Sequence, residues 1–361
     1  MLVYLCFFFF LSWLIFLAGR VPVSQARAIV VIVFTLLIGF AGLRGLVGSD
    51  TVSYFLFYEQ FKDPEIVSSY LTKMEPVFVL LLALHSNVVD SKFLYLFMMS
   101  VFQVWLLYLV YKRSSNRYLF LLCYVLIFYL NFHFNITRAA IAAMLLLVAL
   151  TSGSGRVKVI AALLAPGFHF SVLFFYPLFF TRISFRFFLM LAVFSLAGFI
   201  VVYYYMDFFV AKYHSYENYM SGRSAGVSLA GVLFFVNTLA SILILRKVSF
   251  VFLWVSCLLM FSLIVNEFYP IGYRLVTIGL LLYFYFLLEE LSENSSRTSY
   301  VFFWAPVFLA FSIFMYGVVN EVPVLEKRIA AGEDLGNSLR STYLPYEFYW
   351  ADDDVGESLV P

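Results

Sequence analysis

A short polar stretch near the N-terminus combines a cation, a carboxylate and aromatic rings directly after an apolar segment. It reads RGLVGSDTVSY over residues 44–54. Gly48 permits a tight turn, and Ser49 or Asp50 is predicted to cap a helix that begins at Thr51. One interpretation is a capped helix at the membrane interface. The other is the polar floor of a binding pocket.

Two further stretches place polar side chains inside apolar segments. In NFHFNITRAA, residues 131–140, Asn135 and Arg138 are three apart and are predicted to share one face of the following helix. In PGFHFS, His169 lies beside a Pro-Gly pair within a charge-free run. Ionisable residues inside membrane segments are functional candidates. The alternatives are an arginine that reaches the headgroups and a neutral histidine bonded to a backbone carbonyl.

A fourth stretch, NEFYPIGYR, carries Glu267 at the end of one apolar run and Arg274 at the start of the next. These two residues either pair with each other or belong to a site. Several arginines on one membrane face suit a lipid-linked diphosphate, because the planar guanidinium matches phosphate oxygens. The ionisable candidates on that face are Arg44, Arg138, Arg223, Arg274, Asp50, Glu267, His133 and His169.

Membrane helices must position these residues. Of 361 residues, 64% are hydrophobic and 12% are charged, whereas a soluble domain carries roughly 25% charged residues. This composition excludes a soluble enzyme and a nucleic-acid binder, and it predicts an all-α polytopic integral membrane protein. Residues 320–361 hold nine acidic and three basic side chains. An acidic polar C-terminal tail is therefore predicted after a membrane domain of residues 1–319.

Charge-free intervals long enough to cross the hydrocarbon, which takes about 20 residues, predict ten full spans. Two further segments fit poorly, since 76–89 is short and 159–181 is interrupted by Pro166-Gly167, so one or two broken or re-entrant helices are expected among 10–12 helices. Lysines and arginines in short loops place residues near 44–75, 132–138, 207–227 and 267–274 on the extracytoplasmic face. The ten spans are residues 1–19, 28–43, 93–111, 118–137, 139–155, 187–206, 224–245, 248–266, 275–288 and 298–320.

The pattern RxxxGxDTxxY at residues 44–54 resembles the signature after the second span in the EpsG family of polysaccharide-biosynthesis membrane proteins. That family is similar to Wzy-type O-antigen and capsule polymerases. NxxR at residues 135–138 and HFS at 169–171 resemble two further motifs, and Arg274 resembles an arginine near the start of a late span. Ala139 stands where the family usually has Gln. The resemblance runs from about residue 30 to 290 and leaves out the acidic tail.

The resemblance implies a GT-C-like glycosyltransferase of the bacterial inner membrane. It would join undecaprenyl-diphosphate-linked oligosaccharide units at the periplasmic face, with membrane lipid and a chain-length regulator protein as further partners. No motif calls for a metal or another cofactor. An O-antigen ligase, a flippase or transporter, and a membrane acyltransferase are the alternatives. The implied ligands of the diphosphate are Arg44, Arg138 and Arg274, although Arg44 could instead hold Asp50. The implied catalytic residues are Arg138 and a base, which is either Asp50 or His169. The implied sugar ligands are Tyr54, Asn135 and Glu267.

Overall fold

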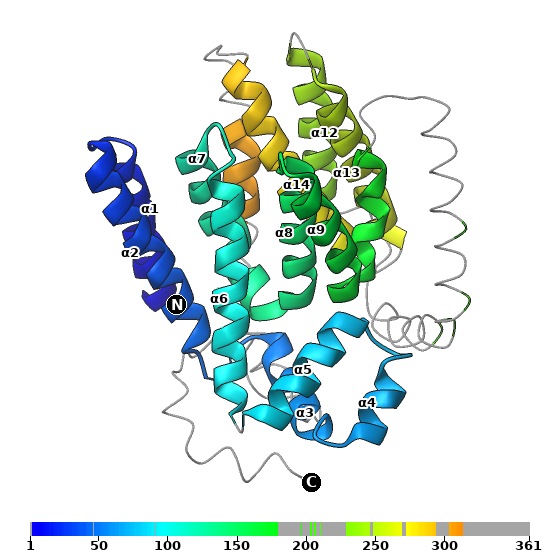
Figure 1. Cartoon of the computed structure of the whole chain (residues 1–361). Helices are drawn as coiled ribbons and strands as arrows, with labels where there is room; N and C mark the ends of the chain where they lie inside the picture. The colour runs from blue at the N-terminus through cyan, green and yellow to red at the C-terminus, as the bar shows by residue number, and fades with distance from the viewer. Residues whose placement is uncertain are drawn as a thin grey trace, which may run out of the picture. The chain divides into compact units, whose positions relative to one another are not determined.

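A computed structural model of the chain describes residues 2–45, 47–89, 91–179, 229–245, 248–268, 272–293 and 303–312, and the single residues 196, 203, 206 and 210. Within these residues the chain is helical and contains no strand (Figure 1). The predicted loop 207–227 with Arg223, apart from residue 210, and the predicted tail 320–361 lie outside the described residues.

The helices have the following bounds in chain order. They are α1 (Leu2–Ala18), α2 (Val23–Gly42), α3 (Ser49–Gln60), α4 (Pro64–Tyr70), α5 (Pro76–Val88), α6 (Lys92–Tyr111), α7 (Arg117–Cys123), the π-helical η1 (Tyr124–Phe128) and η2 (Asn131–Asn135), α8 (Thr137–Thr151), α9 (Gly155–Phe168), the 3₁₀-helical η3 (Phe170–Phe179), α12 (Leu229–Ile244), α13 (Phe250–Phe268) and α14 (Gly272–Glu293). A further helix without a label covers Phe303–Ser312.

Four of these helices, α2, α6, α13 and α14, are long and apolar enough to cross a membrane. They confirm the predicted spans 28–43, 93–111, 248–266 and 275–288 as helices of membrane length. Shorter apolar helices form in several other predicted segments, including α1, α8 and the 13-residue α5. The protein is therefore a multi-pass membrane protein.

The chain divides into two compact units. Unit 1 comprises residues 1–62, 82–140 and 307–361, and unit 2 comprises residues 63–81 and 141–306. In unit 1, α2 and α6 pack closely at Gly42. A Cβ atom at this position would lie 2.7 Å from the ring of Phe97, so only a glycine leaves room for the ring. Twenty residues make each of these helices about 30 Å long.

The predicted break within residues 159–181 occurs at His169, two residues after the Pro-Gly pair. α9 continues through Pro166, and His169 is extended, with φ −161° and ψ 120°. Pro166 has no N–H to donate to the carbonyl of Ala162, and the hydroxyl of Tyr176 donates to that carbonyl instead. Because the orphaned carbonyl has this partner, the helix survives its proline, and the expectation that it breaks at the Pro-Gly pair is wrong.

Replacing Tyr176 by Phe is expected to lower the free energy of unfolding by about 1–3 kcal/mol, because the half-buried Ala162 carbonyl loses its donor. In a Pro166→Ala background the restored backbone N–H serves that carbonyl, so the same substitution should cost less. Thermal unfolding of the four proteins in one detergent measures this cycle. An equal loss in both backgrounds would contradict the assignment.

Candidate functional site

Gly48 shapes the turn that leads into α3. Its φ of 102° lies in the region that favours glycine, and a Cβ there would sit 2.3 Å from the carbonyl oxygen of Phe134. α3 begins at Ser49 and not at Thr51, and Gly48 occupies the cap position without a side-chain bond. The predicted cap is thus wrong, because the backbone of Gly48 starts the helix earlier. Asp50 lies in the first turn, where a carboxylate suits the positive helix end.

Arg44 joins the end of α2 to the first turn of α3. Its residue exposure is 2%, its Nη1 donates to the carbonyl of Ala41 at 2.8 Å, and its Nε donates to Oγ1 of Thr51 at 3.3 Å. The guanidinium carbon lies 4.8 Å from the ring centre of Phe134. Thr51 in turn donates to the carbonyl of Val47 at 2.7 Å. These contacts give Arg44 a positioning role for the turn.

Three of the predicted site residues come together in unit 1. The hydroxyl of Tyr54 donates to Oδ2 of Asp50 at 2.9 Å, and Arg138 at the start of α8 acts on that hydroxyl electrostatically. Burial and then the charge of Asp50 hold the pKa of Tyr54 well above its ordinary value, while the charge of Arg138 acts in the opposite direction. The hydroxyl therefore stays protonated and holds the Asp50 carboxylate.

Asn135 and Arg138 do not share a helix face. η2 ends at Asn135, and Ile136 interrupts the helical path with φ −134° and ψ 41° before α8 begins at Thr137. The predicted common face is wrong because this break lies between the two residues. The residues of the predicted loop 132–138 are helical except at Ile136. Within it His133 is buried, with Nε2 3.1 Å from the hydroxyl of Tyr124.

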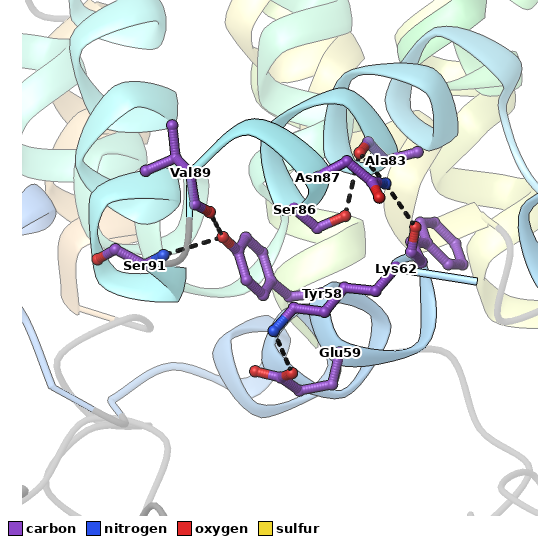
Figure 2. Close-up of polar contacts among 9 residues, drawn as sticks. Tyr58, Glu59, Lys62, Ala83, Ser86, Asn87, Val89 and Ser91 are labelled. Carbon is purple, nitrogen blue, oxygen red and sulfur yellow. Dashed lines mark hydrogen bonds and ion pairs between the residues drawn. The ribbon is translucent and has the colours of Figure 1, made fainter. Parts of the chain in front are cut away.

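The aromatic stripe on α3 is a packed face. Tyr54, Tyr58 and Phe61 are each at most 1% exposed. The hydroxyl of Tyr58 donates to the carbonyl of Val89 and accepts the N–H of Ser91 at 3.0 Å (Figure 2). This one hydroxyl therefore links α3 to the residues that follow α5 and precede α6. The two bonds hold in place the helix that carries Asp50.

In unit 2, His169 lies beside a buried carboxylate that the sequence interpretation missed. Nδ1 of His169 is 4.0 Å from Oε1 of Glu75 and accepts the N–H of Ser171 at 3.2 Å. Glu75 is 2% exposed. A side chain on Gly167 would lie 2.3 Å from Cγ2 of Val77, so a glycine allows α9 to approach the first turn of α5. The sequence does contain a feature that could have pointed to Glu75, because this acidic residue directly precedes Pro76, the first residue of the apolar helix α5.

Glu267 lies at the end of α13 and Arg274 at the start of α14, as the sequence predicts. Glu267 is the penultimate residue of α13, and Arg274 is the third residue of α14. Nη1 of Arg274 is buried and has no hydrogen-bond partner among the described residues. A cation in the first turn of a helix meets the positive end of the helix dipole. An anion at Arg274 would satisfy the donor and offset this repulsion.

No group of three or more His, Cys, Asp and Glu side chains gathers into a metal site in the described parts of the chain. The candidate residues are divided between the two units. Unit 1 holds Arg44, Asp50, Tyr54, Asn135 and Arg138, and unit 2 holds Glu75, His169, Glu267 and Arg274.

Comparison with known proteins identifies a family. The model of the EpsG family matches residues 27–328, which is most of the chain. No curated protein and no solved structure matches the chain. The matched range includes both groups of candidate residues.

Replacing Gly48 by Ala is expected to lower the free energy of unfolding by at least about 1–3 kcal/mol, because the backbone conformation becomes strained and the new methyl meets the Phe134 carbonyl. Gly39→Ala is the matched control, since a Cβ at Gly39 has no atom within 4 Å. Thermal unfolding of both variants in detergent measures the difference. Equal midpoints for the two variants would refute the requirement for glycine at position 48.

Proposed function

The chain belongs to the EpsG family, a family of Wzy-type polysaccharide polymerase-like membrane proteins, and on this premise we propose that it polymerises lipid-linked oligosaccharides. The substrates are undecaprenyl-diphosphate-linked repeat units, joined at the periplasmic face of the bacterial inner membrane by a glycosyltransferase of the GT-C class. The observation that carries the proposal is the group of Arg138, Asp50 and Tyr54, which offers a cation, a carboxylate and a hydroxyl donor together.

In the proposed reaction a hydroxyl of the acceptor sugar attacks the anomeric carbon that bears the diphosphate of the growing chain. The new carbon–oxygen bond forms while the bond from that carbon to the diphosphate oxygen breaks. The electron pair of the broken bond leaves with the diphosphate, and the hydroxyl proton passes to a base. Preorganised cations near the leaving oxygen are usually the largest catalytic contribution.

Arg138 is the proposed ligand of a diphosphate in unit 1. Its guanidinium stays charged at any working pH and matches two phosphate oxygens at once. Asp50, held by Tyr54, is the proposed base for the acceptor hydroxyl, a role that contributes about 10²–10⁴-fold. Tyr54 and Asn135 would contact sugar. Arg44 is assigned to positioning the turn, because it contacts this protein's own backbone, Thr51 and Phe134.

Arg274 is the proposed phosphate ligand of unit 2, with Glu267 as a sugar ligand. The support is the buried Nη1 without an acceptor among the described residues, together with the position in the first turn of α14. Both lipid-linked reactants carry a diphosphate, so each arginine has a phosphate group to bind.

His169 is a second candidate for the base, and a specific contact favours it. The carboxylate of Glu75 lies 4.0 Å from Nδ1 of His169. A buried carboxylate beside a histidine stabilises the imidazolium that forms when the ring takes a proton. Glu75 would then act through His169 as a positioning residue.

Arg138→Ala and Arg274→Ala are expected to leave a single repeat unit on the lipid A core while the protein still reaches the membrane. Arg138→Lys should be nearly as severe, since a point charge does not replace a bidentate fork. Silver-stained polysaccharide and a membrane immunoblot measure this, with the exposed Arg156→Ala as the control. Normal ladders from the two alanine variants would refute the phosphate roles. Free lipid-linked polymer would instead indicate a ligase, and cytoplasmic accumulation a flippase.

Asp50→Asn is expected to slow polymer formation by about 10²–10⁴-fold, as loss of a general base does. Glu75→Gln and His169→Asn should then change the rate by less than about tenfold. Purified protein and lipid-linked repeat units allow the initial rates to be compared, with the exposed Glu65→Gln of α4 as the control. The reverse order of effects would assign the base to His169.

A further inference from the structure

A basic cavity lies between one end of α2, the end of α6 and the start of α7, all within unit 1. Its volume is about 470 Å³. We propose that this cavity binds the phosphate of an anionic phospholipid, as a site separate from the Arg138 group. The residues that carry the argument are Arg27, Lys112 and Arg117 with Tyr108, Tyr111 and Tyr118.

The length of α6 separates this cavity from the Arg138 group. The ring centre of Tyr95, in the first turn of α6, lies 6.3 Å from that of Tyr58 on α3, the helix that carries Asp50. Tyr111, the last residue of α6, lines the cavity. Sixteen residues at about 1.5 Å each place these two positions roughly 24 Å apart along one helix. Because α6 is long enough to cross the hydrocarbon, the cavity faces the opposite membrane surface from the Arg138 group.

Two of the three cations of the cavity lie against an aromatic ring, and none of the three pairs with a carboxylate among the described residues. The ammonium of Lys112 lies 5.5 Å from the ring centre of Tyr108, and the guanidinium of Arg117 lies 5.0 Å from the ring centre of Tyr118. No acidic side chain lines the cavity, and none of the three cations pairs with a carboxylate within the described part of the chain. Aromatic rings orient a cation without using up all its N–H donors. The cavity therefore attracts an anion.

The rest of the lining identifies the anion as part of a lipid. Val23 and Val31 line the same cavity and are 60% and 64% exposed, so an apolar surface continues from the cations along α2. A soluble anion would make no favourable contact with this apolar surface, whereas the acyl chain of a lipid can pack against it. Basic pockets between membrane helices on the cytoplasmic side bind anionic headgroups, and the Lys and Arg content of these loops predicts that side.

An adjoining cavity of about 510 Å³ adds polar residues to the site. It shares Lys112, Arg117 and Tyr118 with the first cavity and adds the side chains of residues 114–116, two serines and an asparagine. Hydroxyl and amide groups suit the glycerol hydroxyls of a headgroup such as that of phosphatidylglycerol. The two cavities together thus match an anionic glycerophospholipid with its phosphate at the shared cations.

Native mass spectrometry of the purified full chain with added phosphatidylglycerol or phosphatidylcholine tests the proposal. The expected result is at least about tenfold tighter binding of phosphatidylglycerol, and a loss of about 10- to 100-fold of that binding in an Arg27→Gln, Lys112→Gln, Arg117→Gln triple variant. A Lys62→Gln, Lys73→Gln, Lys92→Gln triple variant removes equal charge elsewhere and should bind within about twofold of the unchanged protein.

Equal binding of the two lipids, or an unchanged affinity in the first triple variant, would overturn the proposal. Competition by millimolar inorganic phosphate would also overturn it, by assigning the cavity to a soluble anion. Thermal unfolding in phosphatidylcholine shows whether each triple variant folds. If the first triple variant does not fold, two single variants at opposite ends of α6 are compared instead. Lys112→Gln should weaken the binding of phosphatidylglycerol, and Lys92→Gln should leave it unchanged.

Discussion

A backbone carbonyl that loses its helical partner in the interior of a protein needs another hydrogen-bond donor, which a side chain can supply. Arg44 supplies it to Ala41 at the end of α2, and Tyr176 supplies it to Ala162 below the proline of α9. Tyr58 does the same for the residue that follows α5. The turns that carry the candidate site exist because long polar side chains fold back onto these carbonyls.

This requirement divides the arginines into two kinds. Arg44 is buried and bonded to its own turn, so its charge stabilises the structure that holds Asp50. Arg274 keeps a buried donor with no acceptor within the described residues, at a helix end that already repels cations. Arg44 thus holds the backbone of its own turn, whereas Arg274 is proposed to bind a phosphate. The hydrogen-bond partners distinguish the two uses, and residue type does not.

The membrane-length helices could be predicted because a helix must have about 20 apolar residues to cross the hydrocarbon, and the sequence shows such intervals directly. The pairing of Asp50 with Tyr54 follows from a spacing of four on a helix. The start of α3 depends on the carbonyl of Phe134, which is distant in sequence and excludes a side chain at Gly48. The role of Glu75 depends on how α9 packs against α5. Such contacts between distant segments leave no local pattern, and the sequence interpretation missed them for that reason.

The two π-helical turns, η1 and η2, set the rotational phase of the chain that precedes α8. A π-helical turn holds one residue more than an α-helical turn, and one residue corresponds to about 100° of rotation. Phe134 touches both Gly48 and Arg44 at its present phase. A chain shortened by one residue between 124 and 133 would turn the Phe134 carbonyl away from Gly48 and the Phe134 ring away from Arg44. A deletion in this segment would therefore disturb the turn before α3 from a position about 90 residues further along the chain.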